Sequence, residues 1–164
     1  MLFCRGPTAH QLSMIKPLKE DTKIAIVVKE IEGQAQMLAQ LPLIQLLNPA
    51  MSLARYEQLL THMLANGYRM VGAFDGNACV GLSGFWINSK LYSGKYLEVD
   101  NFVVAEAYRS AGIGKLLSHW MEQEARRHQC DTIMLDAYVT NSAAHRFYFR
   151  EGFHIKSYHF YKNL

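Results

Sequence analysis

The alternation of apolar and polar residues predicts regular structure from residue 24 onward. Residues 24–31 form a β-rich run, which ends before Gly33. Residues 34–47 are rich in Ala, Gln and Leu and are predicted to be helical, with an interruption at Pro42. Ser52 is expected to cap a second helix that presents apolar residues on one face and ends at Asn66 and Gly67.

Three further β-rich runs follow, separated by short turns. Residues 68–74 and 79–88 flank Asp75-Gly76, a pair typical of a tight hairpin turn. A second turn at residues 92–94 leads to the run at residues 95–104. Because short turns join antiparallel neighbours, these three strands are expected to form an antiparallel meander.

A glycine-containing turn then opens an amphipathic helix. Residues 109–114 read Arg-Ser-Ala-Gly-Ile-Gly. Apolar residues recur behind them at helical spacing: Ile113, Leu116, Leu117, Trp120, Met121 and Ala125. Residues 132–139 are predicted to be a strand, Asn141 to cap a short helix that closes at Gly152, and residues 153–162 to be a final strand.

This order predicts an α/β fold with a mixed sheet. The sheet is expected to be mostly antiparallel and flanked by helices, with a right-handed parallel β-α-β crossover around residues 112–128. Residues 22–164 are expected to be a single domain, and residues 1–21 an irregular leader in which Met14 is a candidate start.

Composition excludes several classes of protein. The formal charge is +3 and there is no run of Lys or Arg, which argues against nucleic-acid binding. The sequence has three scattered cysteines and no zinc-binding pattern, so no metal is expected and a reducing cytoplasm is favoured. No signal peptide or apolar run of membrane length is found, so a membrane role is not expected either.

The glycine turn is the strongest functional signal. Glycines at the start of a helix allow backbone N–H groups to converge, and the helix dipole favours an anion such as a pyrophosphate there. The β-rich run upstream supplies the strand-turn-helix order that a phosphate cradle requires. The alternative is an ordinary strand-to-helix turn.

With these elements in place, the chain resembles the GNAT N-acetyltransferase superfamily over roughly residues 22–162. Its acetyl-CoA signature, Arg/Gln-x-x-Gly-x-Gly/Ala, matches Arg109, Gly112 and Gly114. A second signature matches in full, at Asn141, Ala144, Phe147, Tyr148, Gly152 and Phe153. The order and separation of the two signatures also agree with the family.

The resemblance implies an acetyl-CoA site. The pantetheine arm would lie along Phe102, Val103 and Val104 like an added strand. Backbone groups of Phe102 and Val104 would hold it. The pyrophosphate would be wrapped by the turn of Arg109, Ser110, Ala111, Gly112, Ile113, Gly114 and Lys115, and Asn141 and Tyr148 would also contact the cofactor. Ser110 departs from the usual glycine. The short segment after Gly152 suggests a last strand that is single or completed by a partner, and hence a homodimer.

Acetyl transfer to an amine requires removal of a proton from the amine and a hydrogen bond or proton for the departing thiolate. Tyr148 is the candidate acid, and its alternative role is that of a core aromatic. Glu98 and Asp100 are candidate bases, or anchors for a cationic amine, or part of a solvated strand face. Strand alternation places both on one face with Tyr96 and Phe102 unless a bulge intervenes.

The sequence thus predicts an acetyl-CoA-dependent N-acetyltransferase that works by direct transfer in a ternary complex. The expected acceptor is a primary amine, either on a small molecule or on a peptide or protein lysine. A noncatalytic acyl-CoA-binding module is the main alternative. A Rossmann-type nucleotide site is disfavoured, because a third glycine is missing and a meander of strands precedes the helix.

Overall fold

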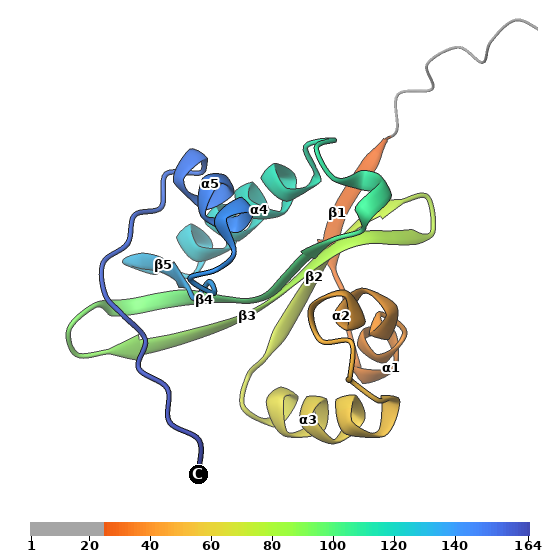
Figure 1. The fold of residues 1–164 in the computed structure, drawn as a ribbon, viewed down its shortest axis with the longest axis horizontal. Helices are drawn as coiled ribbons and strands as arrows, with labels where there is room; N and C mark the ends of the chain where they lie inside the picture. The colour runs from red at the N-terminus through yellow and green to blue at the C-terminus, as the bar shows by residue number, and fades with distance from the viewer. Residues whose placement is uncertain (1–24) are drawn as a thin grey trace, which may run out of the picture.

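Five strands form one mixed sheet in a computed structural model that describes residues 25–164 (Figure 1). The predicted leader at residues 1–21 and the candidate start at Met14 lie outside the described residues. In chain order the elements are β1 (Ile26–Glu30), α1 (Gln34–Leu38), α2 (Leu41–Leu47), α3 (Leu53–Ala65), β2 (Arg69–Asp75), β3 (Ala78–Lys90), β4 (Gly94–Val104), the 3-10 helix η2 (Glu106–Tyr108), α4 (Ile113–Arg127), β5 (Thr132–Leu135) and α5 (Ser142–Arg150).

The sheet order follows the chain, β1-β2-β3-β4-β5. The first four strands pair antiparallel, and β5 pairs parallel to β4 after the crossover through α4. This confirms the predicted mixed α/β fold with its meander and its single parallel crossover. No helix of the described chain is both long and apolar enough to cross a membrane.

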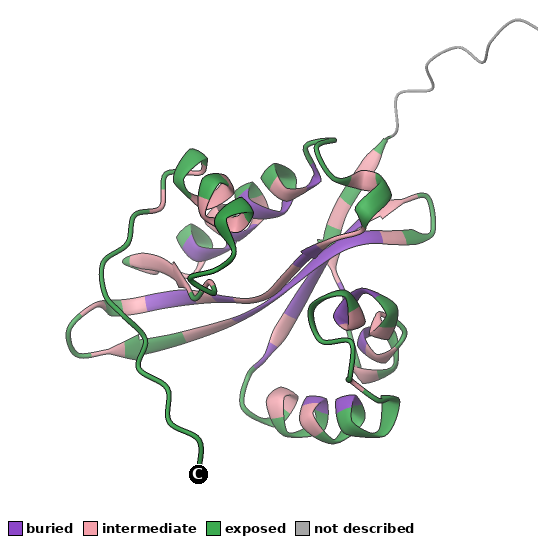
Figure 2. Cartoon of the chain, viewed as in Figure 1, coloured by how far each residue is buried: buried purple, intermediate pink, exposed green. Residues whose placement is uncertain are grey.

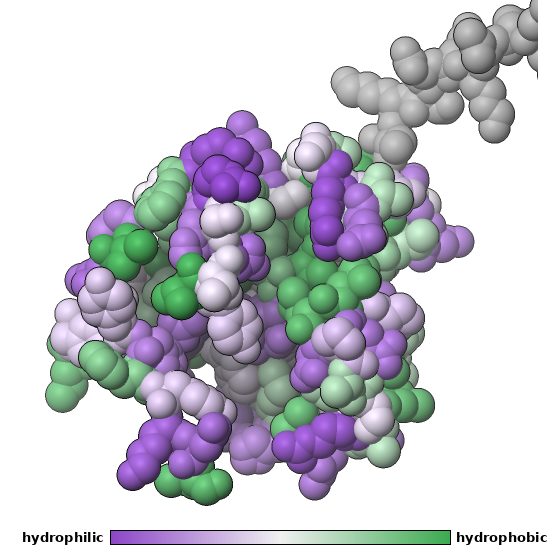
Figure 3. Space-filling view, viewed as in Figure 1, coloured by the Kyte–Doolittle hydropathy of each residue, from purple (hydrophilic) through white to green (hydrophobic). Residues whose placement is uncertain are grey.

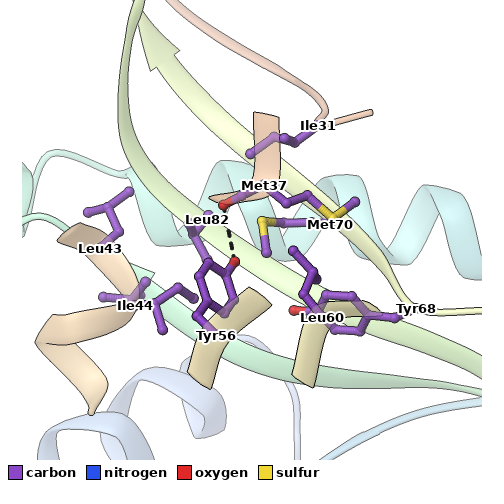
Figure 4. Close-up of a cluster of buried hydrophobic side chains, with 10 residues drawn as sticks. Ile31, Met37, Leu43, Ile44, Tyr56, Leu60, Tyr68, Met70 and Leu82 are labelled. Atoms are coloured by element: carbon purple, nitrogen blue, oxygen red, sulfur yellow. Dashed lines mark hydrogen bonds between the residues drawn. The ribbon is translucent and has the colours of Figure 1, made fainter. Parts of the chain in front are cut away.

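Strand alternation divides the core into two apolar layers, one on each face of the sheet (Figure 2). Met70 of β2 packs with α1, α2 and α3, and Val71, the next residue, packs with α4. On the first face the Tyr56 hydroxyl donates a hydrogen bond of 3.1 Å to the backbone oxygen of Met37, which ties α3 to α1 (Figure 4).

A buried carboxylate joins α4 to the sheet. Glu124 is 1% exposed, and its Oε1 lies 2.7 Å from Arg69 Nη1 and 3.0 Å from His128 Nε2. Arg127 contacts the other carboxylate oxygen, and Arg69 also pairs with Glu30 of β1 at 2.6 Å. Burial acts to raise the pKa of Glu124, but hydrogen bonding and attraction from these cations outweigh it and hold the pKa below its ordinary value.

Three predicted elements differ from the structure. The helical segment at 34–47 is two helices, and Pro42 lies in the first turn of α2, where its missing N–H costs nothing. The strand predicted at 132–139 ends at Leu135. The predicted final strand at 153–162 is wrong, because that segment has no regular structure and exposes Tyr158, Phe160 and Tyr161. High β-propensity does not make a strand where no neighbouring strand supplies hydrogen bonds.

Candidate active site

One edge of β4 is open over its second half. β3 pairs with β4 as far as Val104, whereas β5 pairs with it only from Tyr96 to Val99, opposite Thr132 to Leu135. Within the described chain, the segment from Asp100 to Val104 therefore has no strand on its β5 side. Such an edge presents backbone N–H and C=O groups that an extended ligand can pair with.

A β-bulge changes the direction of the side chains in this open segment. Leu82 is opposite Val103 but Gly84 is opposite Asp100, so β4 has one extra residue, and Asn101 adopts a positive φ of 52°. Before the bulge, odd-numbered residues such as Val99 pack toward α4, and after it Phe102 does so. The sequence placed Phe102 on the same face as Tyr96, Glu98 and Asp100 unless a bulge intervened. The bulge does intervene, so Phe102 lies on the other face.

The N-terminus of α4 lies at the end of the open edge, and no side chain caps it. Gly112 is the N-cap, with φ 83° and ψ 0° and no side-chain hydrogen bond, whereas Ser52 caps α3 and Asn141 caps α5. The first N–H groups of an α-helix have no partner inside the helix, so those of α4 are available to a ligand. Ser110 also has a positive φ, 63°, and is exposed.

The two glycines of the turn have different structural roles. Open space surrounds Gly112, so the positive φ is what favours glycine there. A Cβ added at Gly114 would lie 3.1 Å from the ring of Phe147 on α5. The second glycine therefore allows α5 to pack closely against the first turn of α4.

An aromatic cluster places Tyr148 beside the open edge. The ring centroid of Tyr148 lies 6.2 Å from that of Phe102 on β4, 5.3 Å from Phe147 and 5.7 Å from Phe153. Burial among these rings raises the pKa of Tyr148 to about 12. Tyr148 is thus both a packed aromatic residue and a neutral hydrogen-bond donor throughout the physiological pH range.

A cavity of about 450 Å³ lies between this cluster and the ends of β4 and β5. Its walls are three carboxylates, three aromatic side chains, two amides and Val99: Glu98, Asp100, Asp136, Trp86, Phe102, Tyr148, Asn88 and Asn101. The space-filling view shows a recess in this face of the molecule (Figure 3). The cavity is large enough for a small amine or the end of a lysine side chain.

Asp100 of β4 is a carboxylate whose pKa is raised. Burial raises the pKa of Asp100, as do the nearby charges of Glu98 and Asp136, although hydrogen bonds from Asn101 and Trp86 partly oppose this. Asn101 Nδ2 donates to Asp100 Oδ2 at 2.7 Å. A carboxylate with a raised pKa is better matched to proton removal than an ordinary one.

The structure brings four of the fourteen predicted site residues together at the cavity. Glu98, Asp100, Phe102 and Tyr148 line one cavity, and the turn that contains Gly112 lies at the far end of the same β4 edge. The Asn141 side chain is engaged in its own helix, where Oδ1 accepts from the backbone N–H of Ala144 at 3.1 Å. Arg109 is exposed and pairs with Glu106 at 3.3 Å.

Five cavity residues were not predicted from the sequence: Trp86, Asn88, Val99, Asn101 and Asp136. Asp136 directly follows β5, and the carboxyl end of a parallel strand is a frequent position for functional side chains. The predicted strand at 132–139 hid this signal by placing Asp136 inside a strand. Among residues 25–164 no three His, Cys, Asp or Glu side chains are grouped so that they could hold a metal ion.

Comparison with known proteins supports the same family. The sequence model of the acetyltransferase (GNAT) family matches residues 37–153. The chain is 25% identical over 139 residues to an uncharacterized N-acetyltransferase of Bacillus subtilis (strain 168), covering 84% of this chain and 98% of that protein. It is 31% identical over 98 residues to the aminoalkylphosphonate N-acetyltransferase of Salmonella typhimurium, and the match covers 59% of this chain and 62% of that protein. The solved structure of a putative acetyltransferase from Agrobacterium tumefaciens has the same fold, with a TM-score of 0.72 and 24% identity. The match covers 84% of this chain and 99% of that protein.

Proposed function

The chain belongs to the acetyltransferase (GNAT) family and is an acetyl-CoA-dependent acetyltransferase, and from this we propose that it acetylates a primary amine by direct transfer in a ternary complex. The acceptor is a small-molecule amine or the lysine of a peptide or protein.

Acetyl-CoA is proposed to lie along the path from α4 to the cavity. The pyrophosphate would lie against the turn at Arg109–Lys115. It would accept hydrogen bonds from the uncapped N–H groups of that turn, which exclude those of Arg109 and Ala111 because these donate to the carbonyls of Glu106 and Tyr108. The pantetheine arm would pair with backbone groups of Phe102 and Val104 on the open edge. Val103 points to the opposite layer of the core, so it contributes through its backbone. This path leads the thioester toward Asp100 and Tyr148.

The proposed chemistry is attack of the amine nitrogen on the thioester carbonyl carbon. A new C–N bond forms, the C–S bond breaks, and the amine loses one proton while the departing thiolate gains one, so the products are an amide and CoA. We assign proton removal to Asp100, because it lines the cavity beside Tyr148 and burial raises its pKa. Glu98, two residues earlier on β4, is a second carboxylate of the same cavity. Tyr148 donates a hydrogen bond to the thiolate, which takes its proton from solvent, and Asp100 releases the amine's proton to solvent.

The observation that carries this proposal is the uncapped α4 N-terminus at one end of an open strand edge whose other end lies at the cavity. Calorimetric titration with acetyl-CoA, CoA and NAD tests the binding step. We expect binding of acetyl-CoA and CoA and not of NAD, and a preference for NAD would overturn the assignment. Thiol release with a panel of amines and lysine peptides tests catalysis, and binding without any turnover would favour a noncatalytic acyl-CoA module.

We also propose a cytoplasmic location and a homodimer. Cys79 and Cys130 are free thiols, which agrees with a reducing compartment. The segment after α5 exposes large aromatic side chains, including Tyr158 and Phe160, which supports contact with a second copy. Light scattering coupled to size-exclusion chromatography tests the dimer, and the mass of a single chain at all concentrations would contradict it.

A further inference from the structure

The carboxylates of the cavity come from two strands that run side by side. Glu98 and Asp100 lie two residues apart on one face of β4. Leu135, the last residue of β5, is opposite Val99, so Asp136 follows at the level of Asp100. Asp136 and Asp100 line the same cavity, and the charge of Asp136 acts on Asp100. Negative charge is therefore concentrated at one wall of the cavity.

Positive charge does not balance this wall. None of the described residues that line the cavity is a lysine or arginine. Lys90 is attracted to Glu98, but its ammonium lies 4.5 Å over the ring of Tyr96 and does not line the cavity. His159 Nδ1 contacts Asp136 Oδ2 at 2.8 Å from the exposed C-terminal segment. Even with Lys90 included, carboxylates outnumber permanent cations.

The cavity therefore has more carboxylates than a reacting amine needs. One carboxylate suffices to accept a proton from the nucleophilic amine, and that amine is neutral when it attacks. A remaining carboxylate attracts a second positive group and repels a negative one. Trp86 adds an aromatic face, which also favours a cation.

We propose that the acceptor is an amine that carries a second cationic group, as a diamine or polyamine does, and that Asp136 selects for this group. The inference rests on the proposed amine acetylation at this same site. It separates this chain from the Salmonella relative, whose name specifies an aminoalkylphosphonate, because a phosphonate would face three carboxylates here.

The first test compares the kcat/KM of thiol release for butylamine, 1,4-diaminobutane and 3-aminopropylphosphonate, and for lysine peptides with arginine or glutamate neighbours. We expect roughly tenfold higher kcat/KM for the diamine than for butylamine, because each partly exposed ion pair that the second cation forms can raise kcat/KM by as much as about fivefold. The phosphonate should have the lowest kcat/KM. The arginine-flanked peptide should likewise exceed the glutamate-flanked one. Equal values for the diamine and butylamine, or a preference for the phosphonate, would overturn the inference but leave amine acetylation intact. No thiol release with any acceptor would overturn both.

The second test uses variants of Asp136. Asp136→Asn should lower the ratio of the kcat/KM for the diamine to the kcat/KM for butylamine about fivefold; the ratio is the readout because the charge of Asp136 also acts on Asp100, which serves both amines. Asp136→Lys should move the preference toward the phosphonate. His159→Ala removes the contact between the C-terminal segment and Asp136 but keeps the charge of Asp136, so it separates the two effects. Glu57→Gln is the matched control, because it removes an exposed carboxylate on α3, outside the cavity. Equal effects of Asp136→Asn on both amines would show a structural role and contradict the proposal.

Discussion

Replacing Tyr148 by phenylalanine removes one hydroxyl group and keeps the ring that packs against Phe102, Phe147 and Phe153. Because the aromatic contacts are kept, the variant should fold and bind acetyl-CoA as the wild type does. The proposed function of the hydroxyl is to donate a hydrogen bond to the departing thiolate. The change should therefore act on kcat and not on the affinity for acetyl-CoA.

The size of the effect follows from the pKa of the donor. Burial raises the pKa of Tyr148 to about 12, and a thiol has a pKa of about 8.5, so full proton transfer would be uphill by about 5 kcal/mol. Tyr148 is thus expected to donate a hydrogen bond without losing its proton. A hydrogen bond to a charged group contributes about 1.5–3 kcal/mol, which corresponds to a loss of about 10- to 100-fold in kcat.

The assay is thiol release under saturating acetyl-CoA and amine, with the Kd of acetyl-CoA measured by calorimetry. Tyr148→Phe should lower kcat in this range and change the Kd by less than about twofold, since only the hydroxyl is lost. In the wild type, kcat should show no loss near pH 10 from ionisation of Tyr148, since its pKa is higher. Unchanged kcat would exclude the donor role, and an equal loss of acetyl-CoA binding would indicate a structural role.

Three further predictions concern other parts of the molecule. Ser110→Gly should raise the free energy of unfolding by about 0.5–1 kcal/mol in urea denaturation, because Ser110 has a positive φ, and a loss of stability would contradict this. Because the pKa of Asp100 is raised, wild-type kcat/KM should fall as pH falls through a pKa above the usual aspartate value. Asp100→Asn should lower kcat at least about tenfold and remove this limb, and retention of the limb would exclude Asp100 as the base. Glu124→Gln should cost about 3 kcal/mol of stability at pH 7. Since the pKa of Glu124 is lower in the folded protein than its ordinary value of 4.5, the difference in stability between wild type and variant should be complete above pH 4.5. It should disappear as the pH falls through the pKa of Glu124 in the folded protein. A difference independent of pH would refute the ionic explanation.

Sequence periodicity was sufficient for the elements whose apolar faces are buried. The helix α4 begins at Ile113 as its apolar spacing predicts, and Asn141 and Ser52 cap α5 and α3 as their positions predict. These local rules work because capping and amphipathicity depend on neighbours in sequence. The glycine turn was located in the same way.

Features that depend on contacts distant in sequence could not be predicted. The bulge at Asn101 lies where β4 pairs with β3, and it reverses the alternation of side chains, so that Phe102 packs with the α4 layer of the core. The role of Gly114 depends on Phe147, which lies on another helix. The aromatic residues after Gly152 have strong β-propensity but no strand partner, so propensity gave the wrong result there.

The central claim is that main-chain N–H groups at the start of α4 and on the open β4 edge bind CoA. Backbone amide chemical shifts recorded during titration of ¹⁵N-labelled protein with CoA test it directly. The largest shifts are expected at Ser110, Gly112, Ile113 and Gly114 and at Phe102 and Val104. Saturable CoA binding that leaves these amides unchanged and shifts others would contradict the account.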